Sequence, residues 1–241
     1  MQEDLNDVIG AKIAEIEAAG GKHNLSKIDL SKVDKNVSTD WVDAISRSAF
    51  MHNYSVGISG GKVDDYKYNF GVNYLNQEGT IKKTQYERLS LRQSTEKTVV
   101  KDYFTVGSNF TLARSNSRGI SEYNNQGVYD ADYGVISNAI RVEPVIRPKY
   151  RNTDADGNEI GPWKYGSSPY IDYANPLASI DYRDSKSQLL TLVGNAYGEV
   201  NIIKGLKLKS SFGAEMVNSE SKSFSPVYYV SESQRNDENG V

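Results

Sequence analysis

The sequence predicts an all-β fold: an antiparallel meander of about six strands, preceded by a short helix and interrupted by one long loop. Apolar and polar residues alternate with a period of two in several stretches, which is the spacing that separates the two faces of a strand. Short links that contain glycine or aspartate join most of these stretches. Residues 118–185 form a long, irregular, proline-containing segment, which predicts a large loop.

The composition excludes several classes of function. The chain has 241 residues, a formal net charge of -3, two histidines and no cysteine. The absence of cysteine excludes disulfides, thiolate metal sites and thiol nucleophiles. The near-neutral charge and the lack of a basic cluster with interleaved aromatic residues give no argument for nucleic acid. We find no paired carboxylates, phosphate loop or nucleophile elbow, so we expect no enzyme, no cofactor and no metal site.

The hydropathy of the sequence excludes membrane-spanning helices but not membrane-spanning strands. No apolar run approaches the roughly 18 residues of a transmembrane helix, whereas the strands of a membrane barrel alternate and score as polar overall. The first residues, MQEDLNDVIG, lack the basic and apolar regions of a signal peptide. This indicates either a cytoplasmic protein or an internal piece of a longer one.

A helix is predicted over residues 5–19. Leu5, Ile9, Ile13 and Ile16 recur at three- and four-residue spacing, and the glycines at 20 and 21 end the pattern. Residues 22–40 are polar and irregular. We therefore divide the chain into a helical and irregular insertion, residues 1–40, and a β region, residues 41–241.

The first four strands are predicted between residues 53 and 112. The segment around Tyr54–Ile58 alternates and is followed by Gly60-Gly61, which predicts a turn. Further alternating segments surround Leu89–Leu91 and Phe104–Leu112, and a short link is predicted at 96–101. The clearest pattern is in the second strand, where one face would carry Tyr66, Tyr68, Phe70, Val72 and Tyr74, and the other Lys67, Asn69, Gly71 and Asn73.

Two more strands are predicted after the long loop, over residues 188–201 and 206–216, with a tight link at 202–205. A short helix is predicted within the loop, around 133–141. Short links thus alternate with longer ones, near 77–85 and at 118–185, as they do in bacterial outer-membrane barrels. A soluble sandwich need not show this alternation, but the alternating residues alone leave both folds open.

Several ordered blocks carry a family resemblance. They are "TDWVDAISRSAFMHNYSVGISGG" (39–61), "YNFGVNYLNQEGTI" (68–81), "YERLSLR" (86–92), "SNAIRVEPVIRPKYRNTDADG" (137–157), "NPLASI" (175–180) and "GNAYGEVNIIKGL" (194–206). In this order, over residues 39–216, they resemble SusC/RagA-type TonB-dependent outer-membrane transporters. The resemblance implies an internal fragment: about six of the roughly 22 strands of a plugged transmembrane barrel, forming a curved open sheet, with residues 118–185 as an extracellular loop. The family's signal sequence, N-terminal domains and plug are absent from this sequence.

The resemblance also implies what each face contacts. Tyr66, Tyr68, Phe70, Val72 and Tyr74 would face outer-membrane lipid. The residues that would face the lumen are Lys67, Asn69, Asn73, Arg88 and Arg92.

The implied function is import of glycans or other large nutrients, such as peptides, into the periplasm by an integral outer-membrane protein. The implied partners are a SusD-type surface lipoprotein and the TonB complex, which would act through a plug region absent from this sequence. The alternative is a soluble carbohydrate-binding β-sandwich, in which Tyr68, Phe70 and Tyr74 would be buried in a two-sheet core.

Two loop segments contain side chains that could bind a ligand. The segment at 161–173 holds Trp163, Tyr165, Tyr170 and Tyr173, whose rings could contact a substrate or partner or could pack the loop onto itself. The segment "DADGNE" (154–159) resembles half of a calcium loop, but the twelfth position is Tyr165 rather than a carboxylate. An Asp-Gly turn is the better interpretation.

Overall fold

The structure is a computed structural model. It describes residues 2–22, 36–120, 134–151, 154–159, 164–166, 175–182, 184–224, 228–231 and 234–236. The chain divides into two compact units. The loop unit comprises residues 1–45, 122–179 and 227–237, and the sheet unit comprises residues 46–121, 180–226 and 238–241.

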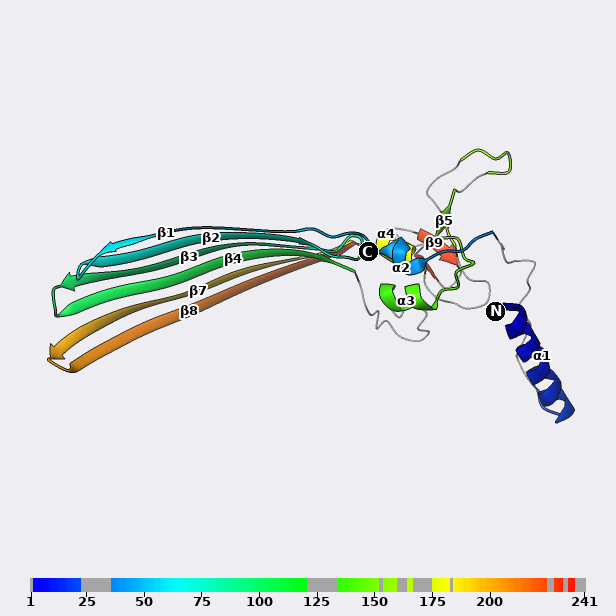
Figure 1. The fold of residues 1–241 in the computed structure, drawn as a ribbon, viewed down its shortest axis with the longest axis horizontal. Helices are drawn as coiled ribbons and strands as arrows, with labels where there is room; N and C mark the ends of the chain where they lie inside the picture. The colour runs from blue at the N-terminus through cyan, green and yellow to red at the C-terminus, as the bar shows by residue number, and fades with distance from the viewer. Residues whose placement is uncertain are drawn as a thin grey trace. The chain divides into compact units, whose positions relative to one another are not determined.

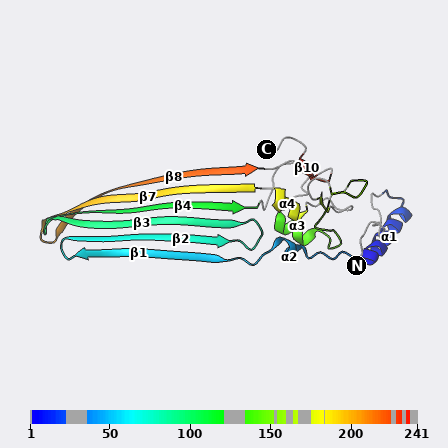
Figure 2. The same ribbon diagram turned by 90° about the horizontal axis from the view of Figure 1, so that it is seen from above.

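The sheet unit is built on one antiparallel sheet of six strands (Figures 1 and 2). Its strand order follows the chain, β1-β2-β3-β4-β7-β8, so every pair of neighbours is consecutive in this sheet. Within the described residues β1 and β8 are open edges. The predicted fold class, an open antiparallel meander of six strands, is therefore confirmed. The strands are β1 (Met51–Lys62), β2 (Tyr66–Glu78), β3 (Gln85–Val100), β4 (Phe104–Gly119), β7 (Asp184–Ile203) and β8 (Leu206–Phe224).

The links of the sheet alternate in length as predicted. Residues 63–65, 101–103 and 204–205 form tight turns, whereas residues 79–84 and the segment between β4 and β7 are longer. Each tight turn contains one residue with positive φ: Asp64 (59°), Asp102 (58°) or Gly205 (87°). Glycine and short polar side chains tolerate this left-handed conformation best, which explains their place in these turns.

Two predicted turn boundaries are wrong. Gly60 and Gly61 lie inside β1, where they pair with Tyr68 and Lys67 of β2. A Cβ atom on Gly60 would lie 2.6 Å from the Tyr68 hydroxyl, so the tyrosine ring crosses this glycine, which lies in a strand and not in a turn. Residues 96–100, predicted as part of a link, continue β3, because their partners in β4 keep the ladder intact almost to the turn.

The loop unit contains short elements. They are α1 (Gln2–Ala18), α2 (Trp41–Ile45), α3 (Val135–Arg141), the hairpin of β5 (Lys149–Tyr150) and β6 (Lys164–Tyr165), the start of α4 (Pro176–Tyr182), and the hairpin of β9 (Tyr228–Ser231) and β10 (Gln234–Asn236). The predicted helices at 5–19 and 133–141 are confirmed as α1 and α3. Beyond α1, Gly20 has a φ of 70°, and the Gly21 amide donates to the Ile16 carbonyl at 2.9 Å, a common way to close a helix. Within the described residues, no helix is long and apolar enough to cross a bilayer.

The core of the loop unit joins segments that are distant in sequence. Trp41 is buried, and its indole Nε1 donates to the Glu143 carbonyl at 3.0 Å. The Thr39 amide donates to the Pro144 carbonyl at 2.7 Å, and the Thr39 hydroxyl donates to the Ile146 carbonyl at 2.8 Å. Two of the sequence blocks that carry the family resemblance, at 39–61 and 137–157, are therefore hydrogen-bonded to each other through Thr39 and Trp41.

Asn175 organises the start of α4. Its side chain is 2% exposed, and its Oδ1 accepts the amides of Leu177 and Ala178 at 3.0 and 3.1 Å. Its Nδ2 donates to the carbonyls of Pro148 and Gly166 at 3.0 and 2.8 Å. One side chain therefore caps the helix and satisfies two carbonyls of the loop at the same time.

Candidate functional site

The two faces of the sheet are the candidate functional surface. Directly paired residues of neighbouring strands share a face, and successive residues alternate between faces. One cross-strand row of the first face, hereafter the aromatic face, contains Val56, Val72, Leu91, Leu112, Leu192 and Met216. A row of the opposite face, hereafter the polar face, contains Gly57, Gly71, Arg92, Thr111, Val193 and Glu215.

Among the described residues, the aromatic face carries a band of exposed apolar side chains, which Gln93, Thr95 and Ser108 interrupt. Phe70 is 44% exposed, Tyr74 37% and Phe212 75%. The soluble sandwich requires Phe70 and Tyr74 to be buried, so in the part of the chain that the structure describes this alternative is not favoured. Monomeric soluble proteins rarely expose so extended an apolar surface, which indicates a face that meets lipid or a partner.

Aromatic rings concentrate near the turn between β1 and β2. Tyr66 stacks with Tyr68 at a centroid distance of 6.2 Å, and Tyr68 lies 6.0 Å from Phe70. The Lys97 ammonium lies 5.7 Å from the centre of the Tyr66 ring and also binds Asp65 in the turn. The hydrogen bond from Lys97 holds the pKa of the half-buried Asp65 carboxyl below its ordinary value.

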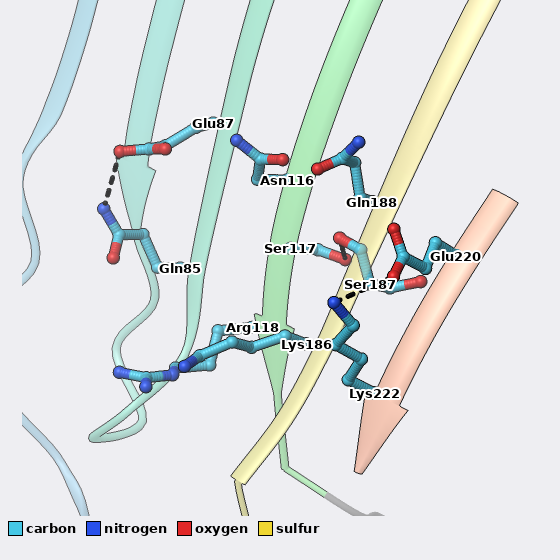
Figure 3. A pocket seen from close by; sticks show the side chains of 10 residues that line it. All are labelled: Gln85, Glu87, Asn116, Ser117, Arg118, Lys186, Ser187, Gln188, Glu220 and Lys222. Atoms are coloured by element: carbon cyan, nitrogen blue, oxygen red, sulfur yellow. Dashed lines mark hydrogen bonds and ion pairs between the residues drawn. The ribbon is translucent and has the colours of Figure 1, made fainter. Parts of the chain in front are cut away.

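Toward the longer links, the aromatic face becomes polar. A hollow of about 410 Å³ lies there, and Figure 3 shows its lining side chains on β3, β4, β7 and β8. Arg118, Lys186 and Lys222 form one cross-strand row. Their repulsion is offset by Asp184, which lies 3.0 Å from Arg118 and 3.1 Å from Lys186, while Glu220 lies 2.8 Å from Lys222. The charged and polar side chains around this hollow are suited to water rather than to hydrocarbon.

The polar face is lined by short polar groups that bind one another across strands. The Asn73 amide donates to Asn53 and to Ser55, both at 2.7 Å. Ser94 donates to Asn109 at 2.7 Å, and Asn109 in turn donates to Asn195 at 3.0 Å. These links join neighbouring strands side by side and make this part of the face hydrophilic.

A charged cluster occupies the polar face near the tight turns. The Tyr197 hydroxyl donates to Glu96 at 2.8 Å, and the Lys209 ammonium lies 3.9 Å from the centre of the Tyr197 ring. The ring crosses Gly107, where an added Cβ atom would lie 2.3 Å from a ring carbon. Two ion pairs flank the cluster: Lys67 with Glu96 at 3.4 Å and Lys207 with Glu199 at 2.8 Å. Sequence reasoning missed this cluster, because only the pairing of four strands brings its members together.

The register places every residue predicted to face lipid on the aromatic face: Tyr66, Tyr68, Phe70, Val72 and Tyr74. It places every residue predicted to face the lumen on the polar face: Lys67, Asn69, Asn73, Arg88 and Arg92. Whether these faces contact lipid and lumen remains a prediction.

The structure describes only one of the four aromatic residues that were predicted to contact a substrate or partner, Tyr165. Trp163, Tyr170 and Tyr173 lie outside the described residues. Tyr165 is 6% exposed, so the expectation of an exposed ring is wrong for this residue, and the alternative, packing within the loop, applies. Its ring lies in the β5–β6 hairpin, with the Lys149 ammonium 6.0 Å from the ring centre.

The segment at 154–159 is a turn. Asp154 Oδ1 accepts the amides of Asp156 and Asn158 at 3.0 and 2.8 Å, and Gly157 has a φ of 84°. Hydrogen bonds from the Asn158 side chain and backbone hold the pKa of Asp154 below its ordinary value. Among the described residues, no group of three or more carboxylates or histidines is arranged to hold a metal ion.

The chain is similar in sequence to two TonB-dependent receptors. It is 28% identical over 191 residues to TonB-dependent receptor P3 of Formosa agariphila and 25% identical over 194 residues to TonB-dependent receptor SusC of Bacteroides thetaiotaomicron. These alignments cover 79% and 74% of this chain, and the chain spans only 18% of the length of each relative. No family model matches the sequence.

Solved structures show the same fold. The structure of the RagAB peptide transporter matches with a TM-score of 0.58 at 22% identity, over 80% of this chain and 20% of the other. The RagAB peptide importer in its open-open state matches with a TM-score of 0.59 at 22% identity, over 83% and 21%. Together the sequence and fold matches confirm the resemblance to SusC/RagA-type TonB-dependent transporters that the ordered blocks predicted.

Proposed function

We propose that this chain forms a wall segment of a TonB-dependent outer-membrane transporter of the SusC/RagA type. In this proposal residues 41–241 belong to a large transmembrane barrel, and residues 118–185 form an extracellular loop. The aromatic face contacts lipid and the polar face lines the lumen. The protein resides in the outer membrane and carries out transport rather than chemistry.

The difference between the two faces is the observation that carries this proposal. On β2, the apolar residues of the aromatic face run from Tyr66 to Tyr74. Eight steps of about 3.3 Å give roughly 26 Å along the strand, or about 20 Å of height at the roughly 35–45° tilt of barrel strands, which is most of the roughly 25 Å apolar band of outer-membrane barrels. Opposite this band stand Lys67, Asn69 and Asn73, which a lipid-facing surface would not tolerate. A wall with lipid on one side and water on the other requires this pattern.

The proposed mechanism follows from the family resemblance. Substrate binds from outside, the TonB complex pulls on a plug domain that fills the lumen, and substrate passes into the periplasm. TonB and the plug would act through parts of a protein outside these 241 residues. The polar face would guide the substrate, and the aromatic band and its rings would hold the wall at a fixed depth in the membrane.

The substrate and the outer partner are proposed from the relatives. The family resemblance implies a large nutrient such as a glycan, and the name of the RagAB peptide transporter supports a peptide. A SusD-type surface lipoprotein is the partner that this type of transporter implies. The long loop between β4 and β7 is the segment that we propose contacts the lipoprotein or the substrate, including Trp163, Tyr170 and Tyr173.

Site-directed spin labelling tests the assignment of the faces. The chain has no cysteine, so single substitutions give clean labels within it. We would introduce Phe70→Cys on the aromatic face and, as a matched control, the adjacent Asn69→Cys on the polar face. Both would be studied in the intact protein in membranes, because adjacent residues share depth and differ only in face.

We expect oxygen, which partitions into lipid, to relax the label at position 70 more strongly than a water-soluble nickel complex does. We expect the opposite at position 69. Equal accessibility to the nickel complex at both positions would refute the membrane wall. Protection of position 70 from both reagents would instead indicate a soluble core.

A further inference from the structure

Two arginines on the polar face differ from the other cations there. Lys67, Lys207 and Lys209 each have a partner: Glu96, Glu199 and the Tyr197 ring. Arg88 and Arg92 make no hydrogen bond or ion pair with any residue that the structure describes. Both are exposed, and only the buried Ser90 stands between them on the same face of β3.

No carboxylate of the sheet can reach them easily. Glu215 lies in the same cross-strand row as Arg92, but β4 and β7 separate β3 from β8. Three strand spacings of about 4.8 Å put the two backbones roughly 14 Å apart. The acidic residues nearest the tight turns, Glu96 and Glu199, are already bound to lysines. The two guanidinium groups are therefore available to a group outside this sheet.

The surface beside the arginines has room for such a group. Both line one hollow of about 490 Å³ together with Ser55, Asn73 and Ser90. Gly57 and Gly71, which face each other across β1 and β2, form its floor. A Cβ atom on Gly71 would meet only a backbone oxygen, at 4.0 Å, so the space above the glycine is empty. The residues that line the hollow supply hydroxyl, amide and guanidinium groups, together with the apolar side chains of Val56, Val72 and Leu75.

Arg88 and Arg92 lie at different depths in the proposed membrane wall. Arg92 pairs with Gly71, in the middle of the apolar band of β2, and Arg88 pairs with Leu75, next to Tyr74 at the outer edge of that band. In the proposed barrel, Arg92 thus stands at mid-membrane depth and Arg88 about 13 Å farther out along the strand. Ionisable residues at membrane depth face an interior and are paired there, because an unpaired charge away from bulk water is costly.

We propose that Arg88 and Arg92 form a carboxylate-binding site that receives acidic side chains of the protein segment filling the lumen. This inference rests on the proposed transport function. Guanidinium groups match carboxylates through two parallel hydrogen bonds, which makes them suited to fixing the register of two protein surfaces. The depth of Arg92 favours a resident protein segment over a passing ligand, since the lumen of such large barrels is plugged.

Zero-length cross-linking in the intact protein identifies the partner. Arg92→Lys and Arg88→Lys keep the charge and supply a primary amine, which a carbodiimide joins only to a carboxylate in direct contact. We expect mass spectrometry to find each introduced amine linked to an Asp or Glu of the lumen-filling segment, outside residues 1–241. Arg114→Lys is the matched control, because Arg114 lies on the aromatic face, where its guanidinium donates to Gln188 at 2.8 Å. This variant should give no link to that segment.

Hydrogen exchange supplies a second readout. Arg92→Gln should accelerate exchange in the lumen-filling segment by on the order of tenfold or more, and Arg92→Lys by less, because the lost partner leaves a carboxylate unpaired. A link that forms only when substrate is present would overturn the resident partner in favour of a ligand. No link together with unchanged exchange would overturn the site while the labelling at Phe70 and Asn69 still supports the wall. Labelling that places both positions in water would overturn the proposed function itself.

Discussion

Replacing Asn175 tests how one side chain holds the loop unit together. Asn175→Ala removes the cap on the Leu177 and Ala178 amides and the donors to the Pro148 and Gly166 carbonyls. Loss of a cap costs about 1 kcal/mol. Each buried carbonyl left without a donor adds roughly 1 kcal/mol or more. The sum is about 3 kcal/mol of local stability, which corresponds to about a hundredfold change in an opening equilibrium.

Hydrogen exchange of the peptide that covers α4 measures this change. The Ser179 amide bonds to the backbone carbonyl of Asn175, a bond that the substitution leaves chemically possible, so its exchange reports opening of the helix. Asn175→Asp is the informative control, because it retains the capping oxygen but turns a carboxylate toward two carbonyls. We expect both variants to exchange faster than the parent protein. If Asn175→Asp exchanged as slowly as the parent, the two donated bonds would contribute nothing, and the reasoning would be refuted.

Three further predictions concern the sheet. Gly107→Ala should displace the Tyr197 ring and destabilise the protein by about 1–3 kcal/mol, whereas Gly119→Ala, which meets nothing within 4 Å, should be nearly neutral in denaturant unfolding; equal effects would contradict the ring contact. The pKa of Asp65 is lowered in the folded state, so the stabilisation from its pair with Lys97 is present above the ordinary aspartate pKa and is lost as pH falls through the lowered value. Lys97→Met should return the pKa of Asp65 toward normal in an NMR titration, and an unchanged titration would exclude the lysine as the cause. The isolated chain, with open edges at β1 and β8 and an uncovered apolar band, should precipitate in buffer without detergent; a monodisperse, cooperatively melting monomer in light scattering and calorimetry would count against the barrel.

The sequence was sufficient to predict the faces, because alternation is a local property of an extended chain. Tyr66 to Tyr74 could be assigned to one face without knowing any partner strand. Gly60 was misassigned to a turn for the opposite reason. The side chain that crosses this glycine, Tyr68, belongs to the next strand, and composition alone cannot distinguish a turn glycine from one beneath a ring.

Local alternation was also sufficient for one part of the candidate site, whereas the rest depends on contacts between segments that are distant in sequence. Arg88 and Arg92 were placed on the polar face by alternation, but their lack of partners depends on the register of the whole sheet. The role of Asn175 was missed although asparagine before proline is a known helix start. Two of its partners, Pro148 and Gly166, lie in other loop segments, so the sequence could indicate the cap and not the bridge.

In the proposed transporter, the side-by-side bonds of Asn53, Asn73, Asn109 and Asn195 would affect the speed of transport. Amide and hydroxyl groups that already bind their neighbours offer a passing sugar or peptide fewer free donors. Each encounter with such a wall is weak and short, and a molecule can exchange one contact for the next without a deep trap. Passage requires binding that is strong enough for entry and weak enough for release. In the proposed transporter, a wall whose polar groups bind one another therefore binds the passing substrate only weakly. Tight binding of the substrate is left to the extracellular loops.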